Sequence, residues 1–150
     1  MAIELEGEFT VPRDREAVFG YLTDLGQVSG RLPDLQSVEV KDPRNATLKL
    51  RVGISFIRGT ATVRLTLAEA NRPESAKFMA QGSMTGNSFD VEAGFHLQSG
   101  DGETRVKWRG LARVGGTLAS VAGGLLEPLA KKNIVRFVEG IRAGIANPGA

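Results

Sequence analysis

The stretch FDVEAGFHLQSGDGETRVKWRGLARV, residues 89–114, decides the fold. Apolar and polar residues alternate along it on both sides of a central Gly-Asp-Gly, which is typical of a tight turn. The pattern therefore predicts two β-strands, near residues 87–99 and 103–114, paired as a hairpin. One face of this hairpin is apolar and the other is charged, as in an antiparallel sheet that exposes one face to solvent.

The same period of two extends upstream of the hairpin. It predicts further strands near residues 36–41, 46–55, 58–70 and 75–84. Two of the breaks between them are turn-forming sequences, Asp-Pro-Arg-Asn and Asn-Arg-Pro-Glu. An N-terminal strand from Ile3 to Val11 alternates in the same way.

Helical spacing occurs in two places. Asp14 is expected to cap a short helix after the N-terminal strand, and Asp24 to begin a second short helix that ends near Gly30. In the C-terminal part of the chain, apolar residues recur at helical spacing: Leu118, Val121, Leu125, Leu129, Ile134, Phe137, Val138, Ile141 and Ile145. They predict one long helix.

This order of elements predicts an α+β fold in a single domain, residues 1–150. We expect a seven-stranded antiparallel sheet wrapped around the long C-terminal helix, with two short helices after the first strand. The apolar face of such a sheet needs a cover, and only the C-terminal helix is long enough to provide it.

Composition excludes several classes of protein. A net charge of +2 and 6% aromatic residues give no reason to expect nucleic-acid binding. The absence of cysteine excludes disulfides and thiolate chemistry. The N-terminus lacks the pattern of a secretion signal, and no run of apolar residues is long enough to span a membrane. We therefore expect a cytoplasmic protein.

The apolar face of the predicted sheet is unusually rich in small residues, which favours a cavity for an apolar ligand under the helix. The candidate cavity residues are Leu65, Phe78, Ala80, Gly82, Phe95, Trp108, Gly110, Leu125 and Leu129. The alternative is that the small residues only let the helix approach closely, which would leave a filled core and an assembly factor without a ligand.

Alternate hairpins of an antiparallel meander lie at the same end of the sheet. One end therefore collects apolar or Gly-rich connections, and we expect it to be the cavity mouth: Ile54, Phe56, Ile57, Met84, Gly115 and Gly116. These side chains are expected to be partly exposed and to meet a membrane or a partner protein. The alternative is that they pack under the helix as ordinary core.

Catalytic residues are scarce on the inward face. The only histidine, His96, has the outward parity of Asp90 and Glu92, and a single histidine without cysteine makes a zinc site improbable. We therefore expect no catalytic residue, no metal and no cofactor. The alternative is an enzyme, a cyclase or hydrolase, that acts on a hydrophobic substrate with polar groups from the short helices.

Several stretches together resemble the CoxG family, proteins associated with aerobic carbon monoxide dehydrogenase, within the START-like (SRPBCC, helix-grip, Bet v 1-like) superfamily. They are GEFTVPRDREAVFGYLTD from Gly7, RLPDLQSVE from Arg31, VGISFIRGTATVRLTL from Val52 and VGGTLASVAGGLLEPLAKK from Val114. Arg-Leu-Pro-Asp stands at Arg31 where the family has Cys-Ile-Pro-Gly.

The resemblance implies a helix-grip fold and a non-catalytic accessory role beside a molybdenum hydroxylase of the carbon monoxide dehydrogenase type. It also implies an isoprenoid quinone as the hydrophobic ligand, whereas the apolar face alone leaves a quinone- or a lipid-like molecule open. A further implication is recruitment to the membrane, with the protein peripheral at its inner face.

Overall fold

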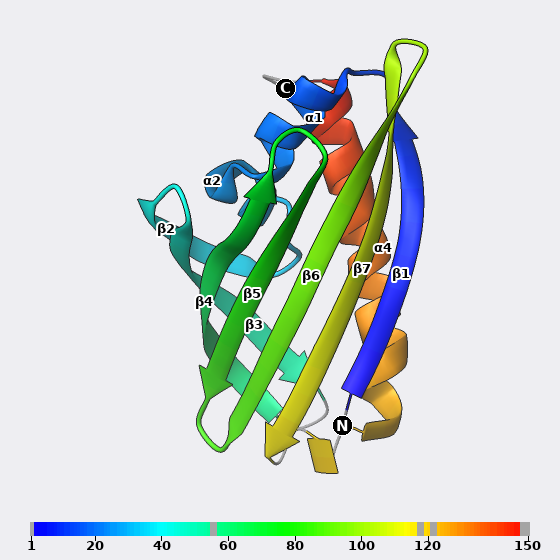
Figure 1. Ribbon diagram of the computed structural model, residues 1–150. Coiled ribbons are helices and arrows are strands. Elements are labelled where there is room, and N and C mark those ends of the chain that lie inside the picture. The colour runs from blue at the N-terminus through cyan, green and yellow to red at the C-terminus, as the bar shows by residue number, and fades with distance from the viewer. Residues whose placement is uncertain (1, 55–56, 117–118, 121–122, 148–150) are drawn as a thin grey trace.

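The computed structural model of the protein describes residues 2–54, 57–116, 119–120 and 123–147. Within them, seven strands form one antiparallel sheet in the order β1-β7-β6-β5-β4-β3-β2 (Figure 1). The strands are β1 (Ala2–Val11), β2 (Leu35–Asp42), β3 (Asn45–Ile54), β4 (Ile57–Asn71), β5 (Ser75–Met84), β6 (Asn87–Gly100) and β7 (Glu103–Gly116). The helices are α1 (Arg15–Leu22), α2 (Leu25–Ser29) and α4 (Gly123–Ala146). The predicted α+β fold is confirmed.

Local hydrogen bonds fix the short helices where the sequence predicts them. Asp14 Oδ1 accepts from the Ala17 amide at 2.8 Å and caps α1, and Asp24 Oδ1 accepts from the Gln27 amide at 3.1 Å and caps α2. The Gln27 side chain also donates to Asp24, and this bond, with those from the Gln27 and Gly26 amides, lowers the pKa of Asp24.

The main hydrophobic core lies at the end of the sheet that α1 and α2 cover. Phe19 of α1 meets Phe95 of β6 edge to face, with ring centroids 6.1 Å apart. Ile141 and Ile145 of α4 are buried in the same cluster. A second, smaller cluster at the opposite end joins Ile3, Ile57 and Leu126. The layer between sheet and helix is therefore closed at both ends by buried side chains.

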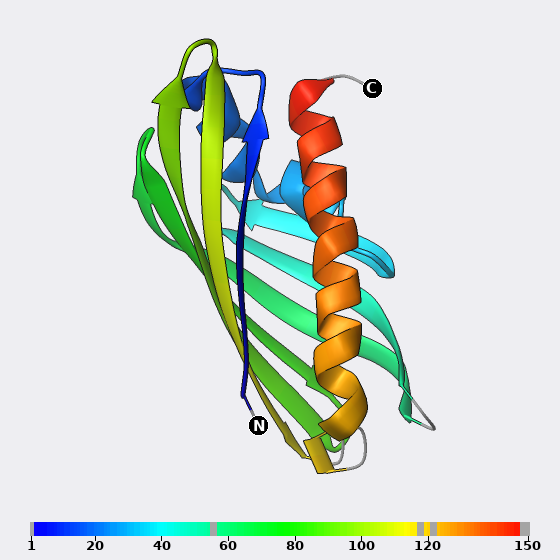
Figure 2. The same cartoon turned by 90° about the vertical axis from the view of Figure 1, so that its right-hand side faces the viewer.

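Helix α4 runs along the inner face of the sheet and packs mainly against β1 (Figure 2). Its C-terminal end is fixed by specific contacts. Arg13, just after β1, donates from Nη1 to the carbonyl oxygen of Ile145 at 3.2 Å. Gly144 lies against Tyr21 and Arg31, and a side chain added there would overlap the Tyr21 hydroxyl. The N-terminal half of α4 contains Pro128.

Candidate functional site

The inward face of the sheet between the two clusters holds apolar side chains that remain partly exposed. They come from five strands: Leu50, Leu65, Phe78, Ala80, Phe89, Val91 and Trp108. Inward residues of a completely filled core would be buried, as the paired Leu97 and Val106 are at the α1 end of the sheet. The middle of the layer between the sheet and α4 is therefore less tightly filled than its ends.

The glycines on this face differ in what surrounds them. Among the described residues, a Cβ added at Gly110 would have only the Glu92 carbonyl oxygen within 4 Å, at 3.9 Å, so it would fit there without a clash. A Cβ added at Gly82 would overlap the Phe89 ring, and one added at Gly7 would lie 2.7 Å from the Trp108 ring. The small residues thus have two roles. Some make room for an aromatic ring, and others have few close neighbours.

Most of the candidate cavity residues lie side by side on neighbouring strands. Leu65 pairs with Ala80, and Phe95 pairs with Trp108. The rings of Phe78 and Phe95 lie 6.1 Å apart, but Phe95 is buried in the main core. Their placement on one face follows directly from the predicted parity.

The two candidate cavity residues on α4 differ in their exposure to solvent. Leu129 is half-buried, whereas Leu125 is 57% exposed, so placing Leu125 inside the cavity is wrong. The reason is the position of the helix: the buried contact with the sheet in this turn is made by the next residue, Leu126, which packs against Ile3 and Ile57.

The predicted mouth residues that the structure describes meet at one end. Ile57 and Met84 line a hollow of about 410 Å³ together with Arg58, Gly59, Thr60, Thr85 and Asn87. Gly115 and Gly116 pair with Ser88 and Asn87 at the same end, and Ile54 pairs with Ile57 through the backbone. Phe56 lies outside the described residues.

Ile57 itself is not exposed as predicted. Only 7% of it reaches solvent, because the first turns of α4 bring Leu126 onto it. For this residue the prediction of a partly exposed mouth is wrong. Ile57 lies between the hollow and Leu126 of α4.

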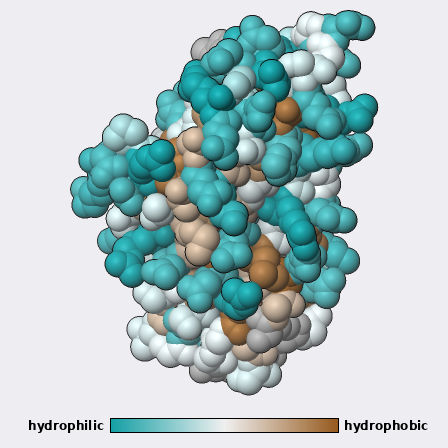
Figure 3. Space-filling model, in the orientation of Figure 1, coloured by the Kyte–Doolittle hydropathy of each residue, from teal (hydrophilic) through white to brown (hydrophobic). Residues whose placement is uncertain are grey.

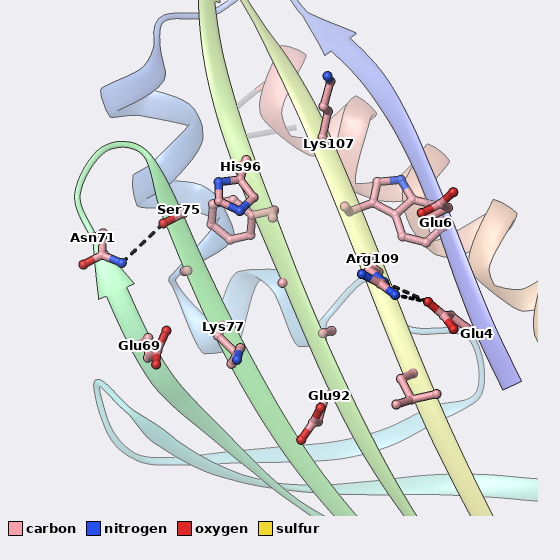
Figure 4. Close-up of a pocket in the computed structure, with 16 residues that line it drawn as sticks. Glu4, Glu6, Glu69, Asn71, Ser75, Lys77, Glu92, His96, Lys107 and Arg109 are labelled. Atoms are coloured by element: carbon pink, nitrogen blue, oxygen red, sulfur yellow. Dashed lines mark hydrogen bonds and ion pairs between the residues drawn. The ribbon is translucent and has the colours of Figure 1, made fainter. Parts of the chain in front are cut away.

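A larger hollow, about 780 Å³, lies on the opposite, outward face of the sheet (Figure 4). That face is mostly hydrophilic (Figure 3). Arg109 Nε donates to Glu4 Oε1 at 2.9 Å, and this hydrogen bond raises the pKa of Arg109. His96 lies here among exposed charged residues, with the outward parity predicted for it. Acids and bases alternate across the strands, as on a solvated sheet face.

Arg31 is a polar residue near α4 that the sequence-based site residues did not include. Its Nε donates to the Tyr21 hydroxyl at 3.1 Å, and its aliphatic stem lies against Gly140. The sequence offered one hint, which is that arginine stands at this position where the resembled family has cysteine. Nothing local in the sequence tells that this side chain reaches α4.

Metal ligands do not gather in the part of the chain that the structure describes. In those ranges, no group of three acidic, histidine or cysteine side chains is placed to hold a metal ion. None of the described helices is both long and apolar enough to cross a membrane.

Solved structures share this fold. A conserved protein from Geobacillus kaustophilus superposes with a TM-score of 0.83 at 22% identity, over 96% of this chain and 95% of that one. A START superfamily protein from Mycobacterium smegmatis gives 0.69 at 11% identity, over 95% and 96%. The Zhui aromatase/cyclase from Streptomyces sp. R1128 gives 0.68 at 17% identity, over 97% and 94%. At these identities the likeness shows the fold alone.

Sequence comparison identifies the family, which the shared fold alone does not. No curated protein sequence matches the chain. A family model does: the model of CoxG, a carbon monoxide dehydrogenase subunit, matches residues 7–146, which is nearly the whole domain. The protein therefore belongs to the CoxG family and has a START-like, Bet v 1-like fold.

Proposed function

We propose that the protein is a non-catalytic carrier that holds a hydrophobic small molecule, quinone- or lipid-like, between the sheet and α4. The observation that carries this proposal is the room for an added Cβ at Gly110, in the middle of an apolar face whose side chains remain partly exposed. A ligand there would bury apolar surface at roughly 25 cal/mol per Å².

The chemistry of the lining favours a carrier over an enzyme. Within the described strands, no inward position carries an acidic, basic or histidine side chain. General acid–base catalysis needs such a group in reach of the substrate. An enzyme related to the Zhui aromatase/cyclase is the second candidate, because that protein shares the fold, and it would have to draw its polar groups from Arg31 and Tyr21.

Membership of the CoxG family supports a partner enzyme and a site of action for this carrier. We propose that it is accessory to a molybdenum hydroxylase of the carbon monoxide dehydrogenase type and exchanges its ligand at the inner face of the membrane. Co-purification of that enzyme with the tagged protein is the measurement that tests this partner.

The ligand site is tested by organic extraction and mass spectrometry of the purified protein, followed by titration with a fluorescent quinone or fatty-acid analogue. Gly110→Leu and Ala80→Phe fill the proposed space and are expected to abolish uptake while the protein stays folded. Uptake equal to that of the parent protein in both variants would show that the site is elsewhere.

Two control variants sharpen the result. Gly53→Leu adds the same side chain on the outward face, where no described residue lies within 4 Å of an added Cβ, and should bind like the parent protein. His96→Ala removes the lone histidine from the outer face and should also leave function intact. A large loss of function in His96→Ala at unchanged stability would favour the enzyme.

A further inference from the structure

One flank of α4 presents a continuous row of residues that begins apolar and becomes basic. Leu125, Leu129, Lys132, Arg136 and Gly140 are spaced three or four residues apart, so they lie along the same side of the helix. Leu125, Lys132 and Arg136 are exposed, and Leu129 is half-buried. This row is not the side that packs on β1.

Contacts at both flanks show which way the row faces. Away from the row, Ala130 packs against the cluster formed by Ile3 of β1, Ile57 and Leu126. On the row itself, Gly140 lies against Arg31, in the segment between α2 and β2. The row therefore faces the β2 side of the molecule, and in Figure 2 the helix runs with β1 on one side and β2 and β3 on the other.

Apolar side chains are exposed on both elements that border the β2 side of the molecule, β2 and α4. Val38 and Val40 occupy inward positions of β2, the edge strand, and are 37% and 48% exposed. Leu125 borders the same side from α4. The end of the molecule at Ile57 is covered by Leu126, and the β1 side is packed, so the β2 side, where these side chains reach solvent, is the least covered side of the inner face.

The ion pairs on α4 leave two cations of the row outside them. Glu127 pairs with Lys131 at 3.4 Å, and Glu139, three residues after Arg136 and next to the row, pairs with Arg142 at 3.3 Å. Among the described residues, Lys132 and Arg136 have no acidic partner within ion-pair distance. On β2, Glu39 is held by Lys41 at 2.8 Å and points to the outward face. The β2 side is therefore bordered by two cations that are not in an ion pair.

We propose that the ligand enters between α4 and the β2–β3 edge, and that Lys132 and Arg136 hold an acidic head group there, a carboxylate or a phosphate, while the apolar chain lies over Gly110. This inference rests on the carrier function proposed above and narrows its ligand to an amphiphile with a negative charge. A guanidinium and an ammonium suit such a head group.

The test compares two fluorescent probes that differ only in the head group, cis-parinaric acid and its methyl ester, in low-salt buffer. The parent protein is expected to bind the acid more tightly. Lys132→Ala and Arg136→Ala should each weaken binding of the acid about threefold, and the double variant about tenfold, as expected for partly exposed ion pairs. Binding of the ester should stay unchanged, and added salt should reduce the difference.

Lys131→Ala is the matched control, since Lys131 is adjacent in sequence but paired with Glu127 on the other side of the helix. Displacement of the probe by a lysophosphatidic acid or by a fatty acid tells a phosphate from a carboxylate. Equal binding of acid and ester by the parent, or an unchanged double variant, would overturn the head-group site and leave the carrier standing. Failure of the parent to bind either probe would overturn the head-group site, and failure to bind the quinone analogue as well would overturn the carrier.

Discussion

Gly82 and Gly110 face the same side of the sheet but differ in their surroundings, and this difference gives a test at the scale of single residues. The Phe89 ring lies over Gly82, so the Cβ of an alanine would overlap it. We expect Gly82→Ala to lower the free energy of unfolding by about 1–3 kcal/mol, the usual effect of overpacking. Urea unfolding monitored by circular dichroism measures it.

The control for this prediction is Gly53→Ala, where no residue that the structure describes lies within 4 Å of the added Cβ. Combining Gly82→Ala with Phe89→Leu should recover part of the lost stability, because leucine gives the new Cβ room. A Gly82→Ala protein as stable as the parent would mean that the Phe89 ring moves aside freely.

The sequence could not separate these two glycines. Parity places both on the inward face, but the direction in which Phe89 lies across its neighbour depends on tertiary packing. The same limit applies to Leu125 and Leu126. Helical spacing marks both as apolar, and only the height and rotation of α4 over the sheet decide that Leu126 is buried and Leu125 is not.

At the scale of elements, most of the fold was predictable because its signals are local. Alternation sets the strands, the side chains of Asp14 and Asp24 cap the helices, and Asp42 accepts from the Arg44 amide at 2.8 Å in the β2–β3 turn. The place where α4 is fastened was not predictable, since Arg31 and Tyr21 meet it from more than a hundred residues away in sequence.

That fastening gives a prediction for α4. Gly144→Ala would overlap the Tyr21 hydroxyl and the Arg31 guanidinium, so we expect a loss of about 1–3 kcal/mol in unfolding free energy. Gly140→Ala is the matched change one turn earlier. There the added Cβ would lie 3.4 Å from the Arg31 Cβ, an ordinary contact distance, and the gain in helix propensity, up to about 1 kcal/mol, should offset any crowding.

Thermal unfolding of the two variants measures this pair. We expect the melting temperature of Gly144→Ala to lie below that of the parent protein, and that of Gly140→Ala to lie close to it. Equal melting temperatures would show that the contact among Tyr21, Arg31 and Gly144 does not fasten the helix.

At the scale of the whole molecule, α4 spans two clusters of unequal size. The α1 end is a full core with two buried isoleucines from α4, and the opposite end is held by Leu126 against Ile3 and Ile57. Small inward residues suggested a space under the helix. How far the helix stands from the middle of the sheet depends on the clusters at both ends together, which no stretch of sequence contains.

This asymmetry predicts how α4 moves. Amide hydrogen exchange should be faster in residues 124–131 than in residues 137–145, because the later segment is fixed by the Arg13–Ile145 hydrogen bond of 3.2 Å and by Tyr21 and Arg31 against Gly144. A ligand under the helix should slow exchange most in the earlier segment, which includes Leu129. Exchange measured by mass spectrometry with and without the fluorescent fatty acid provides the comparison. Uniform protection along α4, or protection by ligand confined to its C-terminal turns, would contradict a site beneath the middle of the helix.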